Sequence, residues 1–309
     1  MSRRTRVQAP SGLLVIDKAP GPSSHDAVEV LRRLYSTPRV GHAGTLDPPA
    51  TGVLLVGLER ATRILSFLQG LAKTYRAGIQ FGETTTTGDA TGEVTERGAR
   101  RIELAELTAA AGSFVGEITQ IPPMVSAVKV GGERLYRIAR RGEQVPRPAR
   151  RITIHKLEVE SFDEESSRAT VRMVCSSGTY VRTLAEDLGE RLGCGGHVRT
   201  LRRLGVGSFS VDEAKTLEAL EAMSRAQRHA LVLPMSVAMR DFPSVVLSAE
   251  ELEAVSHGRP LPAGLETLEG SGGPVAILDP SGQLVAVYRH RGERLEPAAV
   301  LTQSPAPRP

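Results

Sequence analysis

The chain has 309 residues, of which 40% are hydrophobic and 24% charged, and this composition is ordinary for a globular protein large enough for two folded units. Its two cysteines, Cys175 and Cys194, show no CxxC spacing and its seven histidines are scattered, so we expect neither a disulfide framework nor a metal site. No apolar stretch follows the basic start, and none approaches the ~20 residues that cross a bilayer. We therefore expect a cytoplasmic protein without a membrane partner.

The net charge of +4 is unevenly distributed along the chain. Residues 241–309 carry nine acidic and five basic side chains, which leaves +8 on residues 1–240. Between Lys129 and Lys156 there are nine Lys or Arg residues against two Glu. Such a stretch suits a polyphosphate partner, because neutralising phosphates releases counterions. A solvated basic loop accounts equally well for this stretch taken alone.

The first third of the chain shows clear periodic patterns. Residues 12–18 predict a short buried strand that runs into the turn Ala19–Pro22. Ser23 is placed to cap a helix that ends at Leu34, with Asp26 in its first turn. Three further elements are predicted: a strand at 53–58, a short helix at 61–69 and an alternating strand at 73–81.

The middle of the chain continues with both kinds of element. The predicted helices are 103–111, 179–192 and two weaker ones near 212–223 and 226–233, and the predicted strands are 152–159 and 169–175. Strands and helices do not alternate strictly, which argues against a βαβ fold. The expected fold class is therefore α+β, with a mixed, mainly antiparallel sheet flanked by helices.

A domain boundary is expected at residues 241–243, where the charge balance changes sign. Beyond it, Ser248–Glu251 is a capping box that opens a short helix, and residues 275–278 and 284–288 are short strands around the turn 279–282. The predicted organisation is a basic N-terminal arm (1–11), a main domain (12–240, with the basic stretch at about 129–156), a mostly β domain (241–301) and a disordered tail (302–309).

The segment Gly41–Leu54 carries the most information. Its three glycines and two prolines fix an irregular backbone just before a strand, which is a common way to hold a functional side chain. Asp47 lies at its centre, and Pro48 biases it toward extended geometry. Taken alone, Asp-Pro is more often a turn, and His42 is more often a structural histidine. No phosphate-binding glycine loop of the GxGxxG or GxxxxGK[ST] type occurs anywhere in the chain.

Further motifs flank the Gly41–Leu54 segment, one before it and the others after it. They are Gly12–Lys18 with Pro20–Ser24, Lys73-Thr74-Tyr75, Gly82–Gly92, Ile121–Lys129, Ser177–Arg182 and Gly195–Arg203. Together these segments cover most of residues 12–210, and in this combination the chain resembles the bacterial tRNA pseudouridine-55 synthase (TruB-type) family. The resemblance implies a pseudouridine-synthase catalytic domain and a small C-terminal PUA-like domain.

The resemblance also implies the reaction. Pseudouridine formation breaks the N1–C1′ bond of a uridine, turns the base and rejoins it through C5, so no cofactor or metal is required. It needs an ionised carboxylate beside the sugar and base, and by resemblance this is Asp47. Whether Asp47 attacks C1′ or C6, or abstracts a sugar proton, stays open. Arg182 matches the arginine that faces this aspartate, where a cation favours the charged form.

The remaining pocket residues are assigned by resemblance. Tyr75 would stack on the flipped base, with ordinary core packing as its rival interpretation; Tyr180 and Leu201 would form further walls of the uracil pocket. His42 would occupy the space left by the extracted nucleotide. Lys18 would support the pocket loop, with a plain surface lysine as the alternative, and Asp89 would pair with a nearby arginine.

The expected partner is the T stem-loop of tRNA. Phosphate contacts are expected from six arginines, which position the RNA without reading its sequence: Arg199, Arg202, Arg203, Arg134, Arg141 and Arg151. We expect a monomer that needs no protein partner. The alternatives are a pseudouridine synthase that acts on another RNA and an RNA-binding or tRNA-folding protein. The acidic C-terminal domain departs from a simple RNA-binding expectation.

Overall fold

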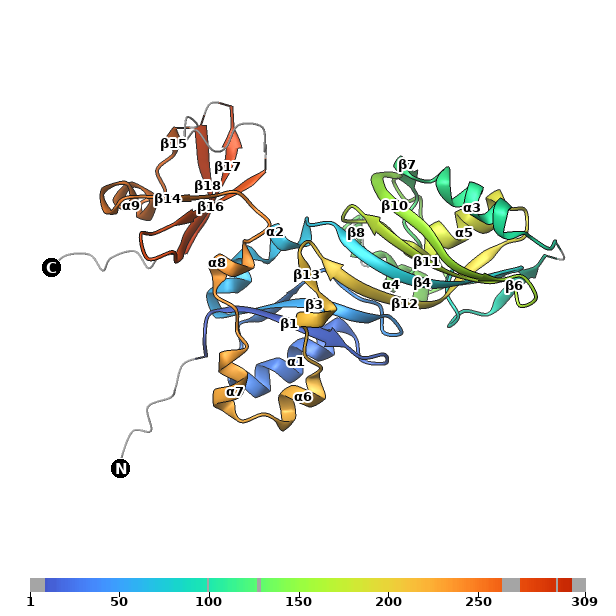
Figure 1. Ribbon diagram of the computed structural model, residues 1–309, viewed down its shortest axis with the longest axis horizontal. Coiled ribbons are helices and arrows are strands. Elements are labelled where there is room, and N and C mark those ends of the chain that lie inside the picture. The colour runs from blue at the N-terminus through green and yellow to red at the C-terminus, as the bar shows by residue number, and fades with distance from the viewer. Residues whose placement is uncertain (1–8, 99, 127–128, 263–272, 293, 302–309) are drawn as a thin grey trace. The chain divides into compact units, whose positions relative to one another are not determined.

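The computed structural model describes residues 9–98, 100–126, 129–262, 273–292 and 294–301 (Figure 1). Most of the predicted N-terminal arm, the predicted disordered tail and Ala127 and Val128 of the Ile121–Lys129 motif lie outside the described residues. The chain divides into two compact units. Unit 1 comprises residues 1–48, 53–70 and 207–309, and unit 2 comprises residues 49–52 and 71–206. This division falls inside the predicted main domain of residues 12–240.

Unit 1 begins with the predicted strands and helices and with one strand, β2, that the sequence patterns do not predict. They are β1 (Gly12–Lys18), α1 (Ser24–Tyr35), β2 (Val40–Ala43), β3 (Thr51–Leu58), η1 (Glu59–Ile64) and α2 (Leu65–Gln69). Strand β3 hydrogen-bonds to β1 and pairs antiparallel with β2. Ser23 and Asp26 form the predicted capping box of α1, which buries an apolar face against the strands.

The later part of unit 1 covers the outer edge of β1. It contains β13 (Phe209–Ser210), η2 (Val211–Glu213), α6 (Leu217–Ala222), α7 (Arg225–Ala230) and α8 (Met235–Ala238). The backbone of Lys215 donates to the carbonyl of Val15 at 3.0 Å, and that of Leu233 donates to Leu13 at 2.8 Å. These bonds satisfy backbone groups that an edge strand otherwise exposes.

The C-terminal segment of unit 1 has its own sheet and core. Its elements are β14 (Ser244–Val246), α9 (Ala249–Ser256), β15 (Leu261–Pro262), β16 (Pro274–Leu278), β17 (Leu284–Arg291) and β18 (Arg294–Val300). The strand order is β14-β16-β17-β18-β15. The Ser248 cap of α9 and the turn at Asp279 are confirmed. This segment is the small, mostly β domain that the sequence predicts.

Unit 2 is built on long antiparallel strands. Its elements are β4 (Lys73–Phe81), β5 (Glu83–Thr85), β6 (Val94–Arg97), α3 (Leu104–Gly112), β7 (Gly116–Gln120), β8 (Lys129–Val130), β9 (Glu133–Arg134), α4 (Leu135–Arg140), β10 (Arg150–Asp163), β11 (Arg168–Cys175), α5 (Val181–Arg191) and β12 (Gly196–Val206). The strand order is β12-β4-β11-β10-β7, and α3 and α5 lie together against these strands (Figure 1).

Strand β3 belongs to both units. Its first two residues, Thr51 and Gly52, pair in parallel with Arg202 and Arg203 of β12, and they are part of unit 2. The pairings of β12 with β4, β4 with β11, β11 with β10 and β10 with β7 are antiparallel, so the predicted mixed, mainly antiparallel sheet with flanking helices is confirmed. Asp47 therefore lies only four residues before Thr51, where β3 begins to pair with β12.

Gly52 has to be a glycine for two reasons. Its φ is +103°, and a Cβ added there would lie 2.1 Å from the carbonyl oxygen of Arg203. We expect Gly52→Ala to lower the free energy of unfolding by about 2 kcal/mol or more, because neither the backbone angle nor the strand pairing tolerates the methyl group. Gly112→Ala is the control, since a Cβ there meets open space at the end of α3. Urea unfolding measures both; equal stabilities of the two variants would contradict this reason for the glycine.

Candidate functional site

The loop that carries Asp47 is fixed on its N-terminal side by Ser24. The hydroxyl of this buried serine, the first residue of α1, accepts from the backbone N–H of Leu46 at 2.8 Å and donates to the carbonyl of Leu46 at 3.1 Å. Both backbone groups of the residue before Asp47 are thereby held by one side chain. Leu46 is itself buried, whereas Asp47 is partly exposed.

The residue after Asp47 is fixed by Lys18. This lysine, at the end of β1, is fully buried, and its ammonium group donates to the carbonyl oxygens of Ala19 at 2.9 Å, Pro22 at 2.8 Å and Pro48 at 3.1 Å. The backbone N–H of Gly21 donates to the same Pro48 carbonyl at 2.9 Å. Lys18 is therefore no surface lysine. It ties the Ala19–Pro22 turn to the Asp47 loop, as a residue that supports this loop must.

His42 and Gly44 lie just before the Asp47 loop in the chain. His42 lies on β2 opposite Val56 of β3 and is partly buried. Gly44 follows with a φ of +95°, a backbone conformation that residues other than glycine rarely adopt. Lys18, His42 and Asp47 thus lie in unit 1, on elements joined by β-pairing and backbone hydrogen bonds.

The other predicted pocket residues lie in unit 2. Tyr75 is on β4, opposite Met173 of β11 and Arg203 of β12, and its side chain is 9% exposed on the face that also buries Ala77, Ile79 and Phe81. Leu201 lies on β12 opposite Ala77, and its carbonyl accepts from the Thr51 hydroxyl at 3.5 Å. Strands β4 and β12 therefore bring Tyr75 and Leu201 into one unit.

Arg182 is buried at the second position of α5, and several groups orient it. It is 6% exposed; its guanidinium donates to the carbonyls of Thr87 at 3.1 Å and Val125 at 2.8 Å, and lies 3.6 Å from the carboxylate of Asp89. The Asp89 carboxylate also accepts from Thr87 and Thr91. The structure thus gives Asp89 the predicted arginine partner. Arg182 itself lies within the helix predicted at 179–192.

Tyr180 depends on a residue that the sequence does not single out. It is the extended N-cap of α5, and its backbone N–H donates to the Gln120 side chain at 3.0 Å, while the Gln120 amide donates to the Tyr180 carbonyl at 3.2 Å. Gln120 is 2% exposed and directly precedes the Ile121–Lys129 motif. A glutamine at the end of a strand carries no signal by itself, so only the fold reveals this clamp.

Two basic residues near Tyr75 are buried. Arg203 is 1% exposed, which argues against the predicted phosphate contact, because a surface phosphate meets no exposed atom of this side chain. Lys73 pairs with Cys175 across β4 and β11, and burial, with a further contribution from the charge of Arg203, lowers the pKa of Lys73 to about 8. Burial raises the pKa of the Cys175 thiol to about 11.

The other arginines predicted to bind phosphate differ in their surroundings. Arg199 and Arg134 are exposed and Arg202 is partly exposed. Arg151 lies 3.4 Å from Glu117. Arg141 donates to Glu133 at 2.6 Å and to Glu143 at 2.7 Å, and these carboxylates raise its pKa. Exposed ion pairs of this kind are weak, so a phosphate is able to displace them.

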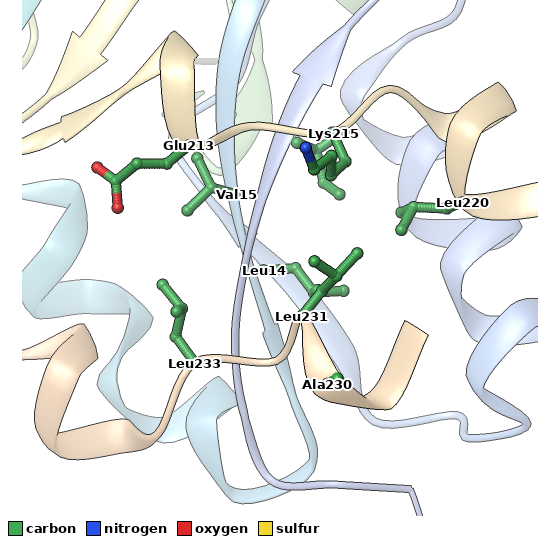
Figure 2. Close-up of a pocket in the computed structure, with 9 residues that line it drawn as sticks. Leu14, Val15, Glu213, Lys215, Leu220, Ala230, Leu231 and Leu233 are labelled. Atoms are coloured by element: carbon green, nitrogen blue, oxygen red, sulfur yellow. The ribbon is translucent and has the colours of Figure 1, made fainter. Parts of the chain in front are cut away.

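A cavity of about 150 Å³ lies elsewhere in unit 1, beside β1 (Figure 2). Leu14, Leu220, Leu231 and Leu233 form most of its wall, with Glu213 and Lys215 at its edge. It contains none of the predicted site residues. In the described part of the chain, no group of three or more His, Cys, Asp or Glu side chains is arranged to hold a metal ion. The described helices are too short or too polar to cross a membrane.

Family models match nearly the whole chain. Residues 32–181 match the TruB family pseudouridylate synthase N-terminal domain, 182–240 the tRNA pseudouridylate synthase B C-terminal domain, and 242–302 the tRNA pseudouridine synthase II C-terminal domain. Solved structures share the fold: a Cbf5-Nop10-Gar1 complex at 26% identity and TM-score 0.74, covering 95% of this chain and 85% of that chain, and an archaeal box H/ACA sRNP Nop10-Cbf5 complex at 25% identity and TM-score 0.72, covering 98% and 90%.

Curated relatives agree with the family models. The tRNA pseudouridine synthase B of Paenarthrobacter aurescens is 45% identical over 94% of this chain and 94% of its own length. The corresponding proteins of Mycobacterium tuberculosis (45%, covering 94% and 95%) and Thermobifida fusca (44%, covering 95% and 99%) are similarly close. The buried Lys18, the fixed Asp47 loop and the Arg182 network thus lie in a chain that belongs to the TruB family of tRNA pseudouridine synthases.

Proposed function

We propose that this chain isomerises the T-loop uridine at tRNA position 55 to pseudouridine, with Asp47 as the essential carboxylate. The observation that supports this most is the fixation of both neighbours of Asp47, by Ser24 on one side and Lys18 on the other. A carboxylate on such a loop is already positioned before substrate arrives, so little conformational entropy is lost when it reacts. The family provides the reaction class, and the loop geometry supports Asp47 as its reactive residue.

The reaction conserves every atom of the uridine. The N1–C1′ bond breaks, the base turns, a C5–C1′ bond forms, and the proton lost from C5 is replaced by one on N1. The base has to leave its stack first, at a cost of a few kcal/mol, and Tyr75 is proposed to stack on the extracted base. His42 is proposed to fill the space it leaves, with Tyr180 and Leu201 as further walls of the uracil pocket.

Arg182 is proposed to compensate the charge of Asp47, so that this carboxylate stays ionised. The hydrogen bonds of Arg182 support this proposal. Its guanidinium is buried and held by two carbonyls and Asp89, so it has one defined orientation. The exposed or partly exposed Arg134, Arg151, Arg199 and Arg202, together with Arg141, are proposed to contact tRNA phosphates, and Arg203 is omitted. A tRNA substrate implies a cytoplasmic enzyme, which we propose acts as a monomer.

Asp47→Asn tests the essential carboxylate. The change removes the charge and keeps the shape, so we expect pseudouridine formation to fall at least about 10³-fold while the Kd for tRNA stays within about twofold. Carbodiimide-dependent primer-extension stops on an unmodified tRNA transcript give the product and its position, and filter binding gives the Kd.

A transcript with cytidine at position 55 is the substrate control and should give no stop. A stop at another uridine by the wild type would contradict the T-loop assignment. Comparable turnover by Asp47→Asn would remove Asp47 from the chemistry, and tight binding without any product from either protein would favour the tRNA-folding alternative.

Lys18→Met tests the support of the loop. The variant keeps an apolar stem but leaves three carbonyls without their shared donor, so we expect a loss of about 2–4 kcal/mol in the free energy of unfolding and slower turnover. Lys215→Met, an exposed lysine with the same change, is the control. A Lys18→Met enzyme as stable and active as the control would show that the ammonium does not hold the Asp47 loop.

Tyr75→Leu separates stacking from core packing. If Tyr75 stacks on the base, the variant loses most of its activity, while its melting temperature stays close to that of the wild type. Phe81→Leu is the control, because Phe81 lies on the same face of β4 and is 1% exposed, so its loss should lower stability by about 1–3 kcal/mol without a specific effect on turnover. A Tyr75→Leu melting temperature as low as that of Phe81→Leu would favour the core interpretation.

A further inference from the structure

One arginine of the basic stretch is turned inward. Arg147, in the loop between α4 and β10, is partly buried, and its guanidinium donates to the carbonyl oxygen of Pro122 at 2.9 Å. This bond joins residues 25 positions apart. By contrast, Arg150, three residues later at the start of β10, is exposed. Charge alone does not distinguish these two arginines, but their surroundings do.

The segment that Arg147 holds also orients Arg182. Pro122 is buried, and three residues further the carbonyl of Val125 accepts from the Arg182 guanidinium at 2.8 Å. The Val125 side chain is 40% exposed, so packing of that side chain alone does not hold its carbonyl in place. A turn, with the Ser126 N–H donating to the Met124 carbonyl at 3.0 Å, shapes the backbone between them. Whatever fixes Pro122 therefore helps to fix a hydrogen-bond acceptor of Arg182.

An apolar cluster connects the same elements. Leu135 and Ile138 of α4 are buried, and Met124, Val145 and Tyr180 pack against them. Val145 is two residues before Arg147, and Tyr180 is two residues before Arg182. The cluster brings the loop of Arg147, the 121–126 segment and the start of α5 into one packed group, so a continuous set of contacts runs from this loop to the residues beside Arg182.

The Glu186 carboxyl is influenced by the charges of both Arg147 and Arg182. It lies one helical turn after Arg182 on α5 and is partly buried. Burial raises the pKa of this carboxyl, with Asp187 adding to the rise, whereas the charges of Arg182 and Arg147 oppose it. The Arg147 guanidinium thus contributes to the electrostatics beside Arg182, as well as to the hydrogen bond with Pro122.

We propose that Arg147 is a positioning residue for the pseudouridine reaction: through the Pro122 carbonyl it fixes the 122–126 segment, whose Val125 carbonyl orients Arg182. This rests on the proposed function, in which Arg182 acts beside the reactive carboxylate. It also separates Arg147 from Arg134, Arg141 and Arg151 of the same basic stretch, which are proposed to contact RNA.

The test compares Arg147→Met with Arg150→Met in the full chain. Both changes remove one positive charge and keep an apolar stem, so both should weaken the tRNA Kd by a similar small factor. Only Arg147→Met should lower the single-turnover rate at saturating tRNA, by about tenfold, because a misplaced orienting group slows the chemical step. Arg147→Lys, which keeps the charge and a donor, should recover most of this rate.

Rates are measured well below the lower of the two melting midpoints. Equal single-turnover rates for Arg147→Met and Arg150→Met would overturn the proposal and make Arg147 an ordinary phosphate contact. An Arg147→Met protein that does not fold would overturn it too, and assign Arg147 to stability. A wild type that makes no pseudouridine would instead refute the proposed function, so the two failures are distinguishable.

Discussion

The Asp47 loop depends on one buried ammonium group. Placing Lys18 out of water is costly, and the structure compensates with the carbonyls of Ala19, Pro22 and Pro48. A lysine that binds three main-chain oxygens joins the end of β1, the following turn and the residue after Asp47 into one rigid piece. The backbone on both sides of Asp47 is therefore held by the side chains of Ser24 and Lys18, which fixes the position of the residue proposed to react.

Unit 2 repeats this principle with a guanidinium. Arg182 is buried and takes two of its acceptors from the backbone, at Thr87 and Val125, while Asp89 provides the nearby negative charge. Backbone acceptors orient a cation without adding a full charge that would compete for it. The orientation of both cations therefore depends on how firmly the loops hold the carbonyl groups that accept their hydrogen bonds. Glycines and prolines are frequent in the segments around these two cations, where the backbone has to present its carbonyls in fixed directions.

Local periodicity predicted β1, α1, β4 and the amphipathic helix α5 within a few residues, because each of them buries one face with a regular repeat. It did not predict β12. Irregular pairings with β4, between Val198 and Thr200 and between Arg203 and Gly205, interrupt its alternation, and Arg199 and Arg202 make it resemble a basic loop. The burial of Arg203 and the Gln120 clamp could not be predicted either, since both depend on residues far away in the sequence.

Counting the charges of the basic stretch treats its arginines as equivalent, whereas their surroundings differ. Of the arginines in the basic stretch, Arg147 donates to a backbone carbonyl and Arg141 is bound by two glutamates, whereas Arg134 and Arg150 are exposed. Counterion release follows the phosphates actually neutralised, and not the number of cations in the sequence. We therefore propose two separable roles for the arginines of this basic stretch, and the hydrogen-bond partners of each arginine indicate which role it has.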